Sequence, residues 1–190
     1  LYSRGPRFRM SAEMIRDNAL AAAGLLSLKQ GGPPIRPYQP DGIWTKIGGQ
    51  NYKYEVSPGE DQYRRGIYVV LKRGAPYPSF INFDASARLA CTVQRSRTNT
   101  PLQALTLLND PVYVEAAMAL ARRVLKEHPE AADDARIEYA FRLCTARTPE
   151  SAERQALRRL LELQRQAAQS DPAAAAKLVG KFEVPESVDK

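Results

Sequence analysis

The second half of this sequence contains three helix-start signals, which constrain its fold more than any other feature. Each places a side-chain oxygen directly before proline, at Thr100-Pro101, Asp110-Pro111 and Thr148-Pro149. The oxygen can accept a hydrogen bond from a first-turn amide, while proline lacks the N–H that would go unpaired there. Gln103 also fits a reciprocal capping box with Thr100. With the apolar periodicity that follows, these signals predict helices over residues 101–108, 111–127, 131–145, 149–169 and 172–179.

The expected helices carry apolar stripes of different widths. The helix over 111–127 should be largely buried, with only Glu115, Arg122 and Lys126 outside. The stripes of 131–145 and 149–169 should pack against each other. The residues of the wide face are Tyr113, Ala117, Leu120 and Val124, with Val114, Met118, Ala121 and Leu125 beside them; the narrower stripes are Ile137, Phe141 and Cys144, and Leu157, Leu160, Leu161 and Ala168.

Another helix is predicted near the start of the chain. Ser11 can cap it, and it should extend to about Leu28 before Gly31-Gly32 end it. Its inner face carries apolar residues at helical spacing: Met14, Ile15, Ala22, Leu25 and Leu26.

Residues 31–78 should be irregular, because they hold eight of the eleven glycines and seven of the fourteen prolines. Six of the nine tyrosines also lie there, near Trp44, and could build either an irregular core or a surface that stacks on sugar rings. Residues 66–72 alone read as a β-strand, whereas residues 61–73 also have helical spacing.

We therefore predict a mainly α-helical protein, an irregular helical bundle whose Gly-, Pro- and aromatic-rich middle segment is dominated by loops. Residues 1–180 should form a single domain, incomplete at both ends, and residues 181–190 a tail. The sequence begins at Leu1 without the pattern of a signal peptide, as expected for a piece of a longer protein. Its longest apolar run, residues 19–26, is too short to span a bilayer.

The net charge of +7 is concentrated in the first half of the chain. Residues 1–100 contain 15 basic and 7 acidic residues, and the remainder contains 13 basic and 14 acidic residues. The excess is mostly arginine, whose planar fork suits carboxylates, phosphates and sulfates. The arginines could bind an anionic partner, or they could pair with carboxylates of the protein itself or of a neighbouring domain.

Catalytic motifs are scarce in the sequence. Its single histidine, His128, stands at a predicted helix end, and the sequence has no nucleophile elbow, phosphate loop, zinc-binding helix motif or haem-attachment motif. We therefore expect no cofactor and no metal in this chain. A pair of carboxylates from among Glu60, Asp61 and Asp84 could serve a polysaccharide hydrolase, although acidic residues beside turns more often form those turns.

The two cysteines, Cys91 and Cys144, allow one disulfide bridge. The alternative is a pair of buried free thiols, which behave as small apolar residues.

The segment from Arg95 to Thr100 is the strongest candidate for ligand binding. Two arginines and the amides of a helix N-terminus could converge on a carboxylate, phosphate or sulfate group. Alternatively, Thr100 caps the helix and the arginines pair with nearby carboxylates. The candidate residues are Arg95, Arg97, Thr98, Asn99, Thr100 and Gln103, together with Arg64 and Arg65.

The same segment carries a family resemblance. The string from Arg97 to Pro111, preceded by Phe83-Asp84 and Cys91, resembles the signature of a planctomycete-specific domain of unknown function. Earlier stretches agree with it, and the resemblance covers roughly residues 1–180. These stretches are Ala12 to Asp17, Gly31-Gly32-Pro33, Pro37 to Trp44 and Tyr63-Arg64-Arg65.

The resemblance implies a mostly helical domain in large exported proteins that also carry a cytochrome-c-like domain, and it transfers no catalytic residue. We therefore expect a non-catalytic structural or ligand-binding module in an extracytoplasmic setting. Its partners would be neighbouring domains of the parent protein or an anionic polysaccharide. A polysaccharide-active hydrolase and a nucleic-acid-binding module are the alternatives, and an exported parent makes the second less favoured.

Overall fold

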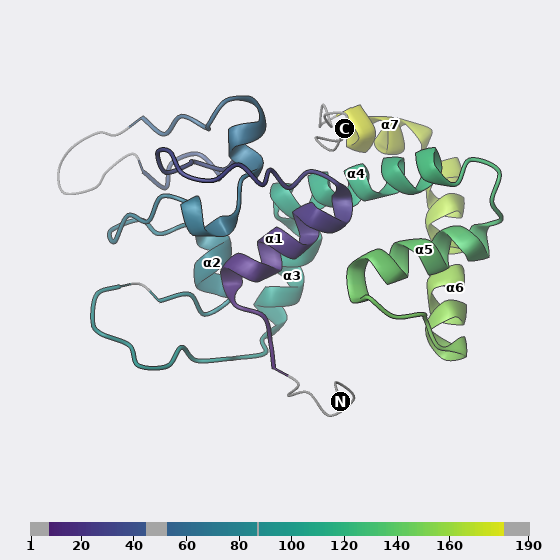
Figure 1. The fold of residues 1–190 in the computed structure, drawn as a ribbon. Coiled ribbons are helices and arrows are strands. Elements are labelled where there is room, and N and C mark those ends of the chain that lie inside the picture. Colours follow the sequence, from purple (N-terminus) through teal and green to yellow (C-terminus); the bar gives the residue numbers. More distant parts are fainter. Residues whose placement is uncertain (1–7, 45–52, 87, 181–190) are drawn as a thin grey trace. The chain divides into compact units, whose positions relative to one another are not determined.

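The computed structural model describes residues 8–44, 53–86 and 88–180, and the tail expected at 181–190 lies outside them. Within these residues the protein is mainly helical and has no strand, which confirms the predicted fold class (Figure 1). Two short 3-10 helices, Gly59–Tyr63 and Gly66–Tyr68, interrupt the loops of the middle segment. The α-helices are α1 (Ala12–Ala23), α2 (Pro78–Asn82), α3 (Pro101–Asn109), α4 (Pro111–Glu127), α5 (Asp133–Thr145), α6 (Ser151–Ser170) and α7 (Pro172–Gly180). None of the described helices combines the length and the apolar character needed to cross a membrane.

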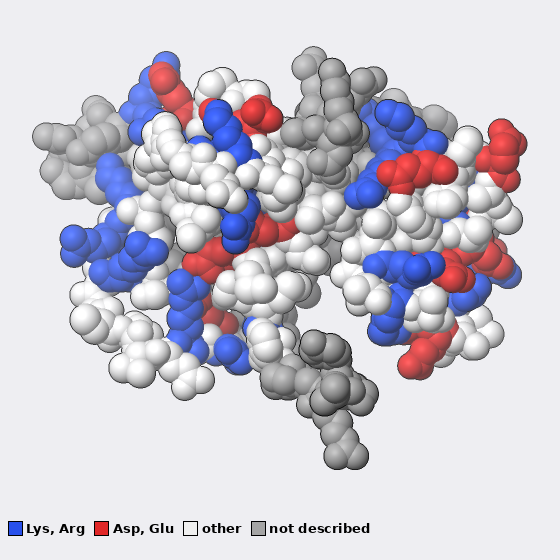
Figure 2. Space-filling model, viewed as in Figure 1, with Lys and Arg blue, Asp and Glu red and all other residues white. Residues whose placement is uncertain are grey.

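The chain divides into two compact units. Unit 1 comprises residues 1–18 and 26–114, and unit 2 comprises residues 19–25 and 115–190. Unit 1 contains 15 basic and 8 acidic residues, whereas unit 2 contains 13 of each, so the whole net charge belongs to unit 1. Over α5 and α6 of unit 2, basic and acidic side chains are intermingled (Figure 2).

Two of the three proline-initiated helices begin where the sequence predicts. At the start of α3, the Thr100 N–H donates to Gln103 Oε1 at 3.1 Å, and the capping box is complete. At the start of α4, Asp110 Oδ1 accepts from the Val112 N–H at 3.0 Å.

The predicted start of α6 at Pro149 was wrong by two residues. Glu150 is the N-cap, and its capping box with Glu153 replaces the expected cap at Thr148. The Glu150 N–H donates to Glu153 Oε2 at 2.9 Å, and Pro149 is buried before the helix. The carboxylate of Glu150 therefore caps α6, although Thr148 carries the more common capping side chain.

Helix α1 is shorter than predicted, and the expected stop at Gly31-Gly32 was wrong. Gly24 follows Ala23 with a φ of 74°, a left-handed conformation that ends helices and that glycine adopts without strain. Residue Ser27, expected inside the helix, instead forms an isolated β-bridge with Arg64. Met14, expected to face inward, is 51 % exposed.

Residues 61–73 form neither the strand nor the helix that their pattern allowed. They contain two 3-10 turns and two isolated bridges, in which Ser27 pairs with Arg64 and Ile35 pairs with Val69. The Gly66 N–H donates to Asp17 Oδ1 on α1 at 2.6 Å, so it is not available to a strand ladder.

Two buried arginines organise these loops in place of a sheet. Arg16 on α1 donates to the carbonyl oxygens of Arg64 at 2.8 Å and Gln62 at 2.6 Å. Arg64 in turn donates to the carbonyl oxygens of Lys29 and Pro33, both at 3.3 Å, and of Gly31, while its guanidinium lies 4.1 Å from the ring centre of Tyr68. The guanidinium groups thus satisfy carbonyls that regular structure would otherwise pair.

In unit 2, α5 packs against α6 as predicted. No residue of either helix is buried, and ion pairs join Arg154 to Glu138, Arg158 to Asp134 and Arg165 to Asp133. The expectation that α4 is largely buried was too broad. Its buried residues form a narrower stripe, Val112, Tyr113, Ala116, Ala119 and Val124, and Ala117, Ala121 and Leu125 are exposed.

Candidate functional site

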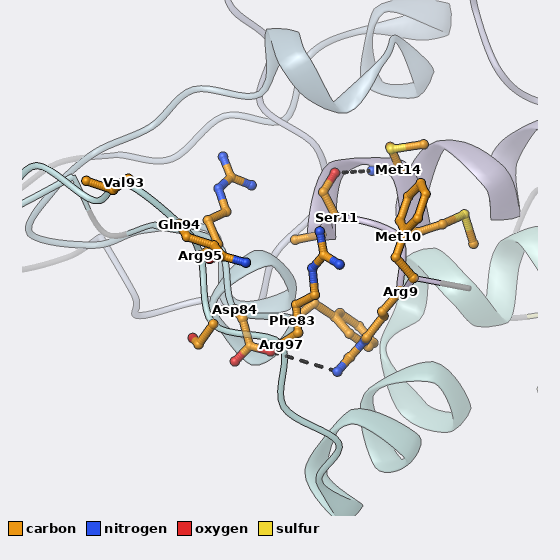
Figure 3. A pocket seen from close by; sticks show the side chains of 13 residues that line it. Arg9, Met10, Ser11, Met14, Phe83, Asp84, Val93, Gln94, Arg95 and Arg97 are labelled. Atoms are coloured by element: carbon orange, nitrogen blue, oxygen red, sulfur yellow. Dashed lines mark hydrogen bonds and ion pairs between the residues drawn. The ribbon is translucent and has the colours of Figure 1, made fainter. Parts of the chain in front are cut away.

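A pocket of about 390 Å³ opens in unit 1 and contains the two arginines singled out in the sequence. The segment before and within the first turn of α1 lies on one side, residues 93–97 lie on the other, and Phe83 and Asp84 lie at the base (Figure 3). The lining residues are Phe8, Arg9, Met10, Ser11, Ala12, Met14, Phe83, Asp84, Val93, Gln94, Arg95, Ser96 and Arg97.

Large apolar side chains form much of the pocket surface. Phe8, Met10 and Met14 are 59 %, 39 % and 51 % exposed, and Val93 is fully exposed on the opposite side. Phe83 is buried and supports the base. Clustered apolar side chains that remain accessible to solvent are typical of binding surfaces.

Arg95 is only partly neutralised by its carboxylate partner. Its Nη1 donates to both oxygens of Glu13, at 2.9 and 2.7 Å. Its Nε and Nη2 make no hydrogen bond to another described residue. Burial opposes the charge on Glu13, but hydrogen bonds from Arg95 and from the backbone hold the pKa of this carboxyl below its usual value. The pair is therefore ionised at neutral pH, and two Arg95 nitrogens remain available.

Arg97 makes no ion pair with any carboxylate among the described residues. Its guanidinium lies 5.5 Å from the ring centre of Phe8, within the range of a cation–π contact. Internal pairing therefore accounts for Arg95 but not for Arg97, and the second arginine leaves a positive charge at the pocket.

A third arginine, Arg9, lies across the pocket base. Its guanidinium is 5.5 Å from the Phe83 ring centre, and its Nη1 is 3.8 Å from Asp84 Oδ2. That nitrogen is shielded from solvent and has no hydrogen-bond partner in the described part of the chain. This nitrogen faces Asp84, so Arg9 contributes positive charge at the pocket base through a loose ion pair.

Asp84 holds the loop that carries Arg95 and Arg97. It has a φ of 61°, which is unusual for a residue other than glycine. Its carboxylate accepts from the Thr98 N–H at 2.7 Å and from the Thr98 hydroxyl at 2.9 Å. The Gln103 side-chain amide donates to the same hydroxyl at 3.1 Å and to the Asn82 carbonyl at 2.9 Å. These bonds fix the loop between α2 and α3.

The other predicted site residues divide into two groups. Thr98, Thr100 and Gln103 stabilise the loop and the cap of α3, and none of them lines the pocket; Asn99 is exposed beside them. Arg64 and Arg65 also lie outside the pocket lining. Arg64 is buried among the carbonyls described above, so we do not include it in the site, and Arg65 is exposed with its Nε 4.0 Å from Asp17.

The carboxylates considered for hydrolysis do not share this pocket. Asp84 lines it, but Glu60 and Asp61 do not, and Asp61 binds Lys29 at 3.1 Å. Among the described residues, no group of three or more His, Cys, Asp and Glu side chains could hold a metal ion. His128 follows α4 and packs edge-on against Tyr139, with ring centres 4.3 Å apart.

Both cysteines are free and exposed, so the expectation of buried thiols was wrong. Cys91 lies in the loop between α2 and α3 in unit 1, and Cys144 lies on α5 in unit 2. Desolvation raises the pKa of the Cys144 thiol.

The half of the pocket that precedes and begins α1 was not predicted from the sequence. Phe8, Arg9 and Met10 were not candidates, Met14 was expected on a buried face, and the pairing of Glu13 with Arg95 was not expected. The only local signal is the run of alternating aromatic, basic and apolar residues at Phe8-Arg9-Met10.

Residues 1–161 match the family described as Protein of unknown function (DUF1553), PSD1. This match covers most of the chain, and the protein belongs to that family. No curated protein and no solved structure matches the chain.

Proposed function

We propose that this chain is a non-catalytic binding module whose unit 1 pocket binds an anionic group of a ligand or of a neighbouring domain. The observation that carries the proposal is Arg97, which lies on a pocket wall without a carboxylate partner among the described residues. Arg95 supplies two further nitrogens, and Arg9 adds positive charge at the pocket base. Charge-assisted hydrogen bonds from guanidinium groups suit carboxylates, phosphates and sulfates.

The cellular setting proposed for this module rests on the resemblance of its sequence to the planctomycete-specific domain. We propose that it belongs to a large extracytoplasmic protein of the planctomycete type, together with a cytochrome-c-like domain, and that neighbouring domains are among its partners. Fractionation of cells that express the parent protein, followed by immunodetection of this module, tests the location. Recovery of the module only in the cytoplasmic fraction would contradict it.

A polysaccharide hydrolase receives less support from the same residues. Asp84 is engaged by Thr98 and faces Arg9, so it serves the loop and the charge balance of the pocket. A glycosidase needs a second carboxyl group within about 5–9.5 Å across the substrate, and neither Glu60 nor Asp61 lines this pocket.

Calorimetric titration with a sulfated oligosaccharide and with a short acidic peptide, at near-physiological salt, tests the binding proposal. We expect Arg97→Ala to weaken the binding of whichever anion binds by about tenfold, because a hydrogen bond to a charged group is lost. Arg159→Ala removes the same charge from an exposed position on α6 and is the matched control. Absence of binding, or equal losses in the two variants, would overturn the proposal.

A further inference from the structure

The chemistry of the pocket also restricts the class of ligand, provided that the proposed anion binding is correct. The lining combines three arginines with four accessible apolar side chains, Phe8, Met10, Met14 and Val93. Its neutral polar side chains are only Ser11, Gln94 and Ser96. A ligand that fits must therefore present an apolar group beside its negative charge.

The apolar part of the pocket suits an aliphatic or aromatic side chain better than a sugar. Met10 and Met14 are flexible and polarisable, and exposed methionines adapt to apolar side chains of varied shape. Sugars are bound mainly through polar side chains that converge on their hydroxyl groups, with an aromatic face beneath. Here the one exposed ring, Phe8, is already faced by the guanidinium of Arg97.

The charged part of the pocket already binds one carboxylate. Glu13 on α1 accepts two hydrogen bonds from Nη1 of Arg95, so a carboxylate can be bound at this side of the pocket. With Arg9, Arg95 and Arg97 opposed by Asp84 in the lining and by Glu13 beside it, a net charge of about +1 remains. This balance suits one or two additional carboxylates, and it gives no advantage to a densely sulfated chain.

The backbone of the wall is also suited to a peptide. Residues 95–97 belong to no helix or strand, and their backbone groups make no hydrogen bond to another described residue. An extended peptide can use such unpaired N–H and C=O groups as it would use a sheet edge, while its side chains enter alternate sites.

We propose that the pocket binds an acidic peptide segment in which an apolar side chain stands next to a carboxylate. The apolar side chain contacts Met10, Met14 and Phe8, and the carboxylate binds Arg97 and the available nitrogens of Arg95. Such a segment can belong to a neighbouring domain of the parent protein or to a separate protein.

Fluorescence anisotropy with three labelled probes tests this assignment. The probes are an acidic peptide with a central leucine, the same peptide with serine in place of leucine, and a sulfated oligosaccharide. We expect the leucine peptide to bind about tenfold more tightly than the serine peptide, since it alone buries an apolar side chain. The combined variant Met10→Ser and Met14→Ser should remove this preference, and thermal unfolding followed by circular dichroism verifies that it remains folded.

The outcomes separate this inference from the proposed function. The peptide assignment is overturned if the two peptides bind equally or if the oligosaccharide binds most tightly. In either case anion binding at the pocket stands if Arg97→Ala weakens the binding that is observed. If none of the probes binds, both are overturned. If the double methionine variant still binds the leucine peptide more tightly than the serine peptide, the leucine contacts another part of the protein. That result would contradict the inference.

Discussion

Nη1 of Arg95 donates to both carboxylate oxygens of Glu13, although 82 positions separate the two residues in the sequence. This contact fastens the loop before α3 to the first turn of α1, and both of these segments line the pocket. It also places an internal carboxylate where an anionic ligand would compete. Glu13 therefore both positions Arg95 and reduces its attraction for a ligand.

Replacing Glu13 by glutamine should strengthen anion binding at the pocket. The amide keeps one oxygen acceptor for Arg95 but no longer neutralises it, and ion pairs at this degree of exposure contribute about 0.2–1 kcal/mol. We expect the affinity for an acidic peptide to rise by about twofold to fivefold. Calorimetric titration of Glu13→Gln beside the unmodified protein measures the change.

Glu60→Gln is the control for this charge removal, because Glu60 is an exposed residue of unit 1 outside the pocket lining. It should leave the affinity unchanged. Weaker binding in Glu13→Gln would show that positioning of Arg95 outweighs neutralisation, contrary to our expectation.

Arg64→Lys should destabilise the protein although the charge is conserved. The guanidinium reaches three carbonyl groups at once, whereas an ammonium is a compact donor that cannot span them. A hydrogen bond to a charged group contributes about 1.5–3 kcal/mol, and we expect a loss of about 2 kcal/mol in the free energy of unfolding. Urea denaturation measures it, with the exposed neighbour in Arg65→Lys as the control. Equal stability of the two variants would contradict the structural role of Arg64.

Gly66→Ala should also destabilise unit 1, because it forces α1 away from the loop. A Cβ at this position would lie 3.0 Å from the Cα of Glu13, which is backbone and cannot rotate aside. Overpacking of this kind costs about 1–3 kcal/mol. Ile67→Ala, at the exposed neighbouring position, should change the unfolding free energy much less. If urea denaturation shows the reverse order, the close packing of Gly66 on α1 is wrong.

The sequence predicted every α-helix of the described residues except the short α2, because the signals of the others are local. A cap oxygen, a proline at the first position and an apolar period lie within a few residues of one another, as at Thr100-Pro101 and in the agreement over 111–127. The errors at Gly24 and Glu150 have the same origin. In both cases the sequence offers two suitable residues close together, Gly24 or Gly31 to end α1 and Thr148 or Glu150 to cap α6. Tertiary packing, rather than local propensity, decides which of the two is used.

The pocket could be predicted only in part, because its contacts are not local. The motif from Arg95 to Thr100 indicated one wall, but its partners Glu13 and Phe8 come from the opposite end of unit 1. The roles of Arg64 and Arg16 could not be predicted from the sequence either. Both side chains are buried and donate hydrogen bonds to backbone carbonyls of distant residues. A surplus of arginine in a sequence is therefore not a direct measure of ligand binding, because buried arginines can instead pair with backbone carbonyls.

The two thiols should react at different rates in the native protein. Desolvation raises the pKa of Cys144, which lowers its fraction of reactive thiolate, whereas Cys91 lies in an exposed loop. At about pH 8, an aromatic disulfide reagent should label Cys91→Ser, which retains only Cys144, more slowly than it labels Cys144→Ser. Both variants should give one thiol after denaturation. Faster labelling of Cys144 would contradict the stated effect of desolvation.

Acid should destabilise unit 2 through Glu153 at the start of α6. Hydrogen bonds from Arg147 at 2.7 and 2.6 Å, followed by the Glu150 N–H, lower the pKa of Glu153 from 4.5 to about 2. The unfolded chain therefore binds a proton at higher pH than the native state does. The contribution of Glu153 is fully present above about pH 4.5 and is lost as the pH falls towards about 2.

In Glu153→Gln, the stability should accordingly fall less steeply as the pH is lowered. The measurement is the urea midpoint of unfolding at steps between about pH 5 and pH 2.5. Glu130→Gln, at an exposed position between α4 and α5, should keep the steep profile of the unmodified protein. The capping acceptor survives in the glutamine variant, because an amide oxygen can still receive the Glu150 N–H, so any difference reports the titration rather than the loss of the cap. Parallel profiles for all three proteins would show that Glu153 does not govern the acid sensitivity of unit 2.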